Sequence, residues 1–543
     1  MDPRRVLLCL LSVLGCTLAD NPVVKTPYGM VQGIYVENVS VFYGIPFAKP
    51  PVGRLRWNAP ETADAWGSEV YNATFQRPSC PQVHCDILSP PLVCPPQTSE
   101  DCLYLDIFTP RAPSPNVAEE YPVMVFIHGG NFVRMSGTSP LYDGRKLAGT
   151  RDVILVNINY RIGALGFLVT GETVSDARGN YGVLDQQFAM KWVKDNIGYF
   201  GGDPSKITLF GESAGAQSTL IHYTLPSSAP YFSRAIVESS PISIPYKRYP
   251  EAILLGAFLA ELLGCTPRDM NCLRSKSSTE IANAQYQTRS KIASLKIMEL
   301  FEPWGPFVDG DLIQAEPLVL IQQGEFNKKP LIIGTVAEET VQYIFSAWNS
   351  SVSMLKYEEV VFATYPSHVF EILNMYSPLE NTTDERNTMV KMSTDLVFVC
   401  PTRNATRNIR SHGVKDVWLY VWDHAFSFPG WGHVTYCEGR VCHGSELVYL
   451  FHTEWAGGFK FTADEEVLSS QIMDFWANFA KRGNPNSFGA TRQKSSAVEA
   501  LNWPAYSSES SWSNYRFKAP TSEIEVKYHG YNCDFWDTIG YAA

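Results

Sequence analysis

The pentapeptide Gly211-Glu212-Ser213-Ala214-Gly215 constrains the fold of this chain more than any other feature. A short apolar run with a β-branched start at 207–210 precedes it and predicts a buried strand, and residues 214–220 favour a helix. A serine between two glycines, in a turn from strand to helix, is typical of a strained turn that has no room for bulk at either glycine. Such a turn lifts the Ser213 hydroxyl clear of the sheet edge, where it can reach a carbonyl carbon.

Short apolar runs alternate with helical patterns along the chain. Buried parallel strands are predicted at 123–127, 153–158, 331–333 and 417–421. Helices are predicted at 184–196, 253–263 and 465–481, and the last two are expected to cover the site and the sheet. This alternation implies an α/β fold with a large, mostly parallel central sheet and helices on both faces. A sheet of this kind places its site at the carboxyl ends of the strands, where Ser213 lies.

The composition narrows the class of partner. The chain has 543 residues with a formal net charge of -11, and its 18% charged and 13% aromatic residues are those of a globular chain rich in core material. The acidic balance argues against a nucleic-acid partner, because phosphate backbones bind positive surfaces. No internal repeat, low-complexity block or long linker divides the chain.

The first residues predict a secretory signal peptide at 1–19. Arg4 and Arg5 form a basic start, 6–14 is apolar, and 17–19 is a small-residue cleavage site. The apolar run is too short for a transmembrane anchor, and no later segment is apolar enough to span a membrane. Cys16 leaves a bacterial lipoprotein signal as the alternative. We therefore expect a secreted protein that begins at Asp20.

The cysteines and the glycosylation sequons are consistent with secretion. An even number of cysteines in the mature, secreted chain predicts disulfides, and metal binding is disfavoured because no two C-x-x-C pairs occur together. The mature cysteines are Cys80, Cys85, Cys94, Cys102, Cys265, Cys272, Cys400, Cys437, Cys442 and Cys533. Sequons for N-glycosylation occur at Asn38, Asn72, Asn349, Asn381 and Asn404.

A serine nucleophile needs a histidine base and a carboxylate that orients the histidine, and in this type of fold the chain order is serine, acid, histidine. Glu338 and Glu339 follow the predicted strand at 331–333 and are the candidate acids. The candidate bases beyond 417–421 are His424, His433, His443 and His452. The residue pattern alone leaves these alternatives open. His128-Gly129-Gly130-Asn131 follows the strand at 123–127 and is typical of a loop whose backbone N–H groups bind an oxyanion.

Several longer motifs carry a family resemblance over nearly the whole mature chain. They are the stretches 43–48, 100–108, 180–186, 200–215 and 479–485. The sequence resembles the type-B carboxylesterases, the carboxylesterase and cholinesterase family of α/β-hydrolases. The resemblance implies a single domain over 20–543 with cap insertions around the sheet. It further implies a small-molecule ester substrate and a covalent acyl-enzyme, with no metal or cofactor, and it sets no oligomeric state.

The resemblance also assigns roles to residues. It implies a triad of Ser213, Glu339 and His443, with Glu338 and His424 outside it. The implied oxyanion donors are Gly130, Asn131 and Ala214, and the implied supporting acids are Glu212 and Glu446. It implies the bridges Cys80–Cys102, Cys265–Cys272 and Cys400–Cys533, which leaves Cys85 to pair with Cys94 and Cys437 with Cys442.

The chain departs from the family pattern at four places. Asn131 stands where the family has the third glycine of the oxyanion loop, and two extra residues follow at about Arg134 and Met135. The 80–102 loop has no tryptophan. The stretch 300–306 carries Glu302 and Trp304 in place of paired phenylalanines. The missing tryptophan argues against choline esters, since tryptophan is the best face for a quaternary ammonium. We therefore expect a secreted serine esterase for neutral esters. The alternatives are a cholinesterase proper and a catalytically silent, neuroligin-like adhesion protein.

Overall fold

The computed structural model describes residues 21–37, 39–85, 93–110, 120–288, 302–378, 383–486 and 501–541. The predicted signal peptide at 1–19 and the sequons at Asn38 and Asn381 lie outside the described residues.

An 11-stranded sheet forms the centre of the described structure, in the order β14-β13-β12-β11-β10-β9-β7-β8-β6-β4-β3. Its strands are β3 (Ile34–Val36), β4 (Val39–Pro46), β6 (Tyr104–Thr109), β7 (Tyr121–Ile127), β8 (Ile154–Ile158), β9 (Gly202–Glu212), β10 (Arg234–Glu238), β11 (Leu331–Val336), β12 (Val417–Trp422), β13 (Ser513–Phe517) and β14 (Glu523–Val526). A second, three-stranded sheet consists of β1 (Val23–Thr26), β2 (Gly29–Gln32) and β5 (Val70–Asn72).

The centre of the large sheet is parallel and its two ends are antiparallel. Every neighbouring pair from β13 to β8 is parallel. The pairs β13–β14, β8–β6, β6–β4 and β4–β3 are antiparallel. The predicted mostly parallel sheet is therefore confirmed for the strands that carry the site, and the whole sheet is mixed. Antiparallel neighbours need no helical crossover, so short segments can extend the sheet at its edges.

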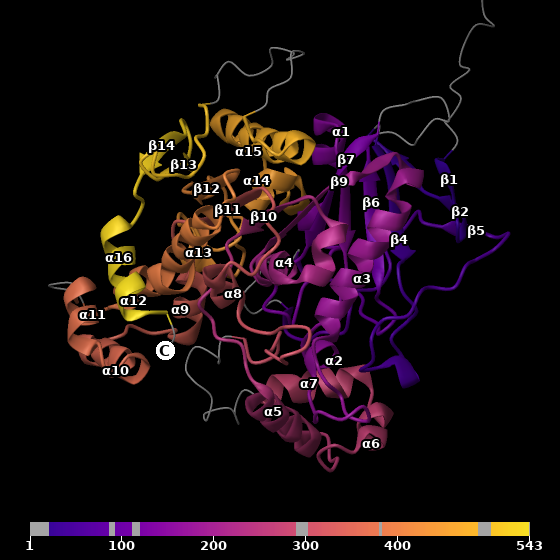
Figure 1. Cartoon of the computed structure of the whole chain (residues 1–543), viewed down its shortest axis with the longest axis horizontal. Helices are drawn as coiled ribbons and strands as arrows, with labels where there is room; N and C mark the ends of the chain where they lie inside the picture. The colour runs from indigo at the N-terminus through magenta and orange to yellow at the C-terminus, as the bar shows by residue number, and fades with distance from the viewer. Residues whose placement is uncertain are drawn as a thin grey trace, which may run out of the picture.

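Helices cover both faces of the sheet (Figure 1). They are α1 (Arg145–Arg151), α2 (Gly163–Phe167), α3 (Tyr181–Asn196), α4 (Ala214–Thr224), α5 (Tyr249–Leu262), α6 (Met270–Ser275), α7 (Ser278–Gln287), α8 (Pro317–Gln323), α9 (Val341–Ala347), α10 (Met354–Thr364), α11 (Val369–Met375), α12 (Arg386–Thr394), α13 (Cys400–Ser411), α14 (Leu447–Phe451), α15 (Ala463–Arg482) and α16 (Gly530–Ile539). A π-helical turn, η9 (Asp395–Val399), joins α12 to α13. Within the described ranges, no helix combines the length and the apolar character that crossing a membrane requires.

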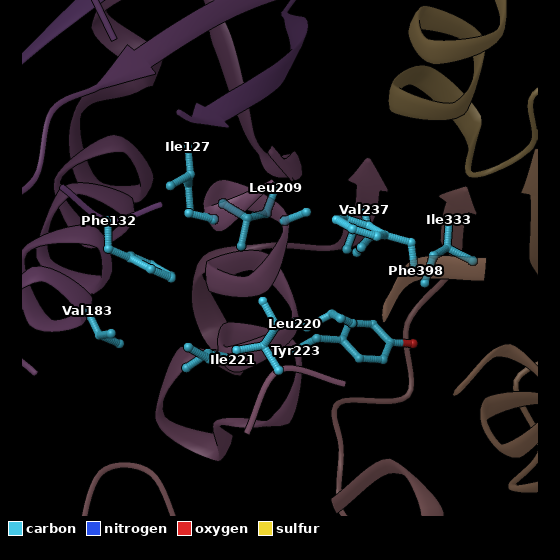
Figure 2. Close-up of a cluster of buried hydrophobic side chains, with 14 of the residues drawn as sticks. Ile127, Phe132, Val183, Leu209, Leu220, Ile221, Tyr223, Val237, Ile333 and Phe398 are labelled. Carbon is cyan, nitrogen blue, oxygen red and sulfur yellow. The ribbon is translucent and has the colours of Figure 1, made fainter. Parts of the chain in front are cut away.

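The side chains of each central strand divide between two cores, as the period of two along a strand requires. In β7, Val125 and Ile127 belong to one apolar cluster, and Met124 and Phe126 belong to the other. The first cluster includes side chains of α3 and α4, and the second includes those of α14 and α15. Figure 2 shows part of the first cluster, with apolar side chains of α4 facing those of the neighbouring strands.

The two helices that were expected to cover the site and the sheet differ in their positions. The predicted helix at 465–481 is α15, which packs on the sheet through the second core cluster. The helix predicted at 253–263 is α5, which lies with α6 and α7 at one end of the molecule (Figure 1). None of the described α5 residues lines the cavity of Ser213 or the apolar cavity that adjoins it. Its apolar face instead packs against α2 and α7, because those helices supply the nearest buried surface.

The start of α4 sits directly against the end of β7. A Cβ atom added at Gly215 would lie 1.9 Å from the carbonyl oxygen of Ile127, and one at Gly211 would lie 2.5 Å from the carbonyl oxygen of Gly215. Both neighbours are backbone atoms, which cannot rotate away. The two glycines of the pentapeptide therefore fix how closely the helix approaches the sheet, and with it the position of Ser213.

We expect Gly215→Ala to lower the free energy of unfolding by about 2–3 kcal/mol, because the added methyl overpacks a backbone contact. Chemical denaturation of the purified protein measures the change. Gly198→Ala is the matched control, since a Cβ atom there meets no heavy atom within 4 Å; its effect is expected to stay within about 0.5 kcal/mol. Equal stability of the two variants would contradict the proposed contact.

Candidate active site

Ser213 stands in a strained turn between β9 and α4. Its backbone has φ 58° and ψ -123°, a conformation that non-glycine residues rarely adopt and that costs on the order of 1–3 kcal/mol. A hydrogen bond to the neighbouring strand β10 stabilises the turn: the Ser213 N–H donates to the carbonyl of Glu238 at 2.9 Å. Ser213 lines a cavity of about 300 Å³ together with His443, Gly130 and Asn131.

Glu339 and His443 meet at the carboxyl ends of β11 and β12. His443 Nδ1 lies 2.5 Å from Glu339 Oε2, and the other carboxylate oxygen of Glu339 accepts from the backbone N–H of Val336 at 2.8 Å. The imidazole is buried between the rings of Tyr343 and Phe398, at centroid distances of 5.7 and 5.2 Å. These contacts fix the ring with its Nδ1–H toward the acid, and His443 lines the same cavity as Ser213.

Glu338, the acid that the resemblance places outside the triad, clamps the turn that carries His443. Its carboxylate accepts from Arg440 Nε at 3.0 Å, from Arg440 Nη2 at 2.6 Å and from the N–H of Val441 at 3.0 Å. Its own N–H donates to the carbonyl of Val441 at 3.2 Å. Arg440 and Val441 lie inside the short 437–442 loop that a disulfide closes immediately before His443. The two adjacent glutamates therefore hold the loop and the imidazole separately.

The loop after β7 closely approaches the strained turn at residues 211–215, which we call the elbow, and it can present its backbone to a ligand there. A Cβ atom at Gly129 would lie 2.8 Å from the carbonyl oxygen of Glu212 and 3.0 Å from Ser213 Cβ, so only glycine fits. Gly130 has φ +100° and Asn131 has φ 52°, which is the left-handed region that asparagine tolerates. The hydroxyl of Tyr160 donates to the carbonyl of His128 at 2.9 Å and supports the loop from behind.

Ala214 is the first residue of α4, and Gly130 and Asn131 line the cavity beside it. The first N–H groups of a helix have no partner within the helix and are available to a ligand. The structure thus brings all three predicted oxyanion donors to the edge of the sheet where Ser213 lies.

A group of buried carboxyls lies around Glu212, which contacts His443. Glu212 Oε1 is 3.1 Å from His443 Nε2, and Glu446 accepts from the hydroxyl of Ser239 at 3.5 Å. Burial raises the pKa of Glu212 to about 7 and that of Glu446 well above its ordinary value. Glu238, which no sequence motif singles out, joins them; burial raises its pKa to about 8 although Trp476 Nε1 donates to it at 2.7 Å.

These carboxyls set the basicity of the imidazole. Burial by itself lowers the pKa of His443, but the charges of Glu212 and Glu339 and the hydrogen bond to Glu339 outweigh it, and the pKa is raised. His443 therefore holds its proton more tightly than an ordinary histidine, and it becomes a free base only at a correspondingly higher pH.

The structure separates the other candidate histidines from this cavity. His424 Nε2 lies 3.2 Å from Glu465 Oε1 and joins the loop after β12 to the start of α15. His433 is exposed. His452 lies between Glu454 at 3.3 Å and Glu466 at 2.9 Å, and in the described part of the chain these three form the one group with metal-ligand spacing. Because both ring nitrogens of His452 already contact carboxylates, the group is arranged as an ion-pair cluster.

The wall of the cavity contains residues that sequence reasoning did not select. Phe426 stacks on Phe428 and on Trp431, with ring centroids 4.9 and 5.1 Å apart, and all three line the cavity. The aromatic-rich stretch after the β12 strand was the available signal. Arg134, one of the two extra residues, is buried and lines the same cavity. Arginine remains protonated in proteins, so it places a permanent positive charge there.

The disulfides and the sequons can be compared with the sequence predictions. The structure joins the ten mature cysteines as Cys80–Cys102, Cys85–Cys94, Cys265–Cys272, Cys400–Cys533 and Cys437–Cys442, the pairs given above. Asn72 and Asn349 are exposed, as a sugar acceptor requires. Asn404 is half-buried in α13, and its side chain already bonds to Gln322 and Asp537.

Comparison with known proteins identifies the family. Residues 20–536 match the profile of the carboxylesterase family. The cAMP-regulated D2 protein of Dictyostelium discoideum is 39% identical over 86% of this chain and 85% of its own length. Para-nitrobenzyl esterase of Bacillus subtilis strain 168 is 35% identical over 90% of this chain and 93% of its own. A carboxylesterase structure from Geobacillus stearothermophilus superposes with a TM-score of 0.79 at 30% identity, covering 95% of this chain and 100% of that chain. The chain belongs to the carboxylesterase family.

This membership confirms the resemblance, the α/β-hydrolase fold and the enzyme class, which is carboxylic ester hydrolase. A small-molecule ester is the substrate that the family implies. The several disulfides are typical of a protein that matures outside the reducing cytosol.

We expect Glu212→Gln to lower the pKa of His443, because the change removes a negative charge 3.1 Å from Nε2 and leaves the effect of burial in place. The imidazole resonances of His443 in an NMR titration, assigned by their loss in His443→Gln, measure the shift. Glu466→Gln is the control, since Glu466 faces His452 instead. An unchanged or higher pKa in Glu212→Gln would show that Glu212 does not set the basicity of this histidine.

Proposed function

We propose that this chain is a secreted serine esterase that hydrolyses neutral carboxylic esters through Ser213, His443 and Glu339. The observation that carries the proposal is the buried Glu339–His443 contact of 2.5 Å, in an imidazole that lines the same cavity as the strained Ser213. An acid, a base and a nucleophile thus lie in sequence at one edge of the sheet, in the roles that acyl transfer requires.

In the proposed reaction, Ser213 Oγ attacks the ester carbonyl carbon while His443 Nε2 takes the hydroxyl proton. Glu339 holds the ring and stabilises the imidazolium that forms. His443 then gives its proton to the departing alkoxide, which leaves as the alcohol, and the acyl group stays on Ser213. Water repeats the cycle: His443 takes a proton from it, the carboxylic acid forms, and Ser213 regains its proton from His443.

The N–H groups of Gly130, Asn131 and Ala214 are proposed to bind the oxyanion of each tetrahedral intermediate. The positive φ of Gly130 and Asn131 supports this role, because it turns consecutive N–H groups in a direction that an ordinary extended loop does not allow. Glu212 and Glu446 are proposed to support the imidazolium. The hydrogen bonds of Glu338 to the 437–442 loop are proposed to hold the turn of Glu339 beside the turn of His443.

Neutral esters are the class that the cavity favours. Its wall is aromatic, which suits apolar acyl and alcohol groups, and Arg134 adds a fixed positive charge that repels a quaternary ammonium. Secretion is supported by the five disulfides and by the exposed sequons at Asn72 and Asn349. We propose that 20–543 acts as one domain, since the family profile matches nearly all of that range.

Labelling tests the nucleophile. An organophosphonate is expected to modify Ser213 alone, and Ser213→Ala and His443→Ala are each expected to lower kcat/KM by about 10⁴-fold or more, because triad members act as a unit. Mass spectrometry and ester kinetics give the two readouts. His424→Ala is the matched histidine control and is expected to retain most activity when folded. Labelling of Ser213→Ala at the wild-type rate, or a larger loss in His424→Ala, would refute the assignment.

A matched substrate pair tests the preference for neutral esters. A choline ester and its uncharged carbon isostere, with the same acyl group, are expected to have kcat/KM values within about tenfold of each other at physiological salt. Arg134→Met is expected to raise the choline ratio about three- to tenfold by removing the positive charge, and the exposed Lys191→Met serves as the control. A preference of more than about tenfold for the choline ester in the wild-type enzyme would identify a cholinesterase instead.

A further inference from the structure

A second, smaller cavity lies beyond Asn131 and Tyr343, two residues that also line the cavity of Ser213. Its volume is about 90 Å³. Its other lining residues are mainly apolar and include Leu396, Val397 and Phe398 of the π-helical turn η9. Phe398 also packs against the ring of His443. The two cavities therefore share part of their wall at the loop of Asn131, and an arm of an ester bound at Ser213 would enter the second by passing Asn131 and Tyr343.

One carboxyl group stands in this apolar lining. Glu302 is buried, and its Oε2 accepts from Gln217 Nε2 at 2.9 Å, the one hydrogen bond that the described residues make to the carboxyl. Gln217 lies one turn along α4 from the nucleophile, since its N–H donates to the carbonyl of Ser213. A helical turn rises about 5.4 Å, so Glu302 sits just below the reacting centre. None of the proposed catalytic steps uses it.

The surroundings of Glu302 leave it able to accept from a ligand. Lys247 Nζ donates at 2.8 Å to the backbone carbonyl of Glu302, and no ion pair to the side chain occurs in the described ranges. Burial raises the pKa of Glu302 to about 7, although Gln217, Lys247 and His443 each act to lower it. Burying a carboxyl whose oxygens lack hydrogen-bond donors carries a desolvation cost. A ligand that donates a hydrogen bond to the carboxyl offsets this cost, whereas a methyl group in the same place does not.

The acyl arm is the one that reaches this cavity. In the proposed reaction the alcohol must depart after the first step, and the larger cavity gives it the wider path. The acyl group stays bound to Ser213 through the second step and needs a site of its own. The second cavity is smaller and lies beside the oxyanion loop, where an acyl chain begins.

We propose that Glu302 makes the second cavity a binding site for acyl chains that end in a hydrogen-bond donor, a hydroxyl or an ammonium group. The inference rests on the proposed serine esterase function and names its acyl substrate class. A site that binds a donor discriminates strongly against the analogue that lacks one, because its acceptor is left unpaired.

The test compares phenyl esters in matched sets across a series of acyl lengths. Each set holds a chain ending in methyl, in hydroxyl and in ammonium, for example heptanoate, 6-hydroxyhexanoate and 6-ammoniohexanoate. At the best length, the wild-type enzyme is expected to favour a donor-ended ester over the methyl-ended one by about tenfold in kcat/KM. Glu302→Leu is expected to reverse this order and to retain hydrolysis of the methyl-ended ester.

Glu302→Gln separates charge from hydrogen bonding. The amide keeps an acceptor oxygen of the same size, so the preference for the hydroxyl-ended ester is expected to persist and that for the ammonium-ended ester to fall. In the wild-type enzyme, the ratio of ammonium- to hydroxyl-ended turnover is expected to rise between about pH 6 and 8 as Glu302 ionises. The protonation of His443 affects both esters alike and cancels in the ratio.

The outcomes are distinct. Faster hydrolysis of methyl-ended esters at every length by the wild-type enzyme, or an unchanged preference in Glu302→Leu, overturns the acyl-site proposal while the esterase function stands. Failure to hydrolyse any ester overturns the proposed function itself. Should Glu302→Leu fail to fold, the wild-type panel and Glu302→Gln decide, and a flat pH ratio with no donor preference counts against the proposal.

Discussion

The contact between the end of β7 and the first turn of α4 determines the rest of the site. The carbonyl oxygen of Ile127 leaves no room for a side chain at Gly215, so the helix can start only at this edge and only with glycine there. Ser213 must then take a positive φ to join β9 to α4. The oxyanion loop leaves the same end of β7, and Gly129 brings it against the elbow. One steric constraint thus places the nucleophile beside its proposed N–H donors.

The electrostatics follow from how deeply these residues are buried. Glu212, Glu238 and Glu446 share a water-poor region, and burial raises the pKa of each. Carboxyls of this kind hold protons near neutral pH, so the cluster does not add three full negative charges beside the triad. Of the three, Glu212 is the one in contact with His443, and its charge raises the pKa of the imidazole together with that of Glu339. The basicity of the proposed base therefore depends on Glu212 as well as on Glu339.

The sequence predicted the elements of the site that depend on local patterns. The strand, turn and helix around Ser213 and the loop at 128–131 were recognisable from glycine spacing and apolar runs, because close backbone approach demands those residues locally. The central strands were predicted too, most of them somewhat shorter than observed; β9 begins at Gly202, ahead of the predicted apolar run at 207–210. The position of α5 was wrong, because periodicity identifies an apolar face without saying which surface covers it.

Other features required the tertiary structure because they join distant parts of the chain. The candidate acids and bases remained open from the residue pattern alone, since 104 residues separate Glu339 from His443 and only the packing of β11 beside β12 brings them together. Arg134 and Glu302 have no motif around them, and their significance comes from burial beside cavities. The sequence by itself determined the tight turn at Ser213, the glycine-rich loop at 128–131 and the α/β class, because steric rules act between neighbouring residues. The tertiary structure decided the partners, the cavities and the charges, because these arise only where separate strands and helices meet.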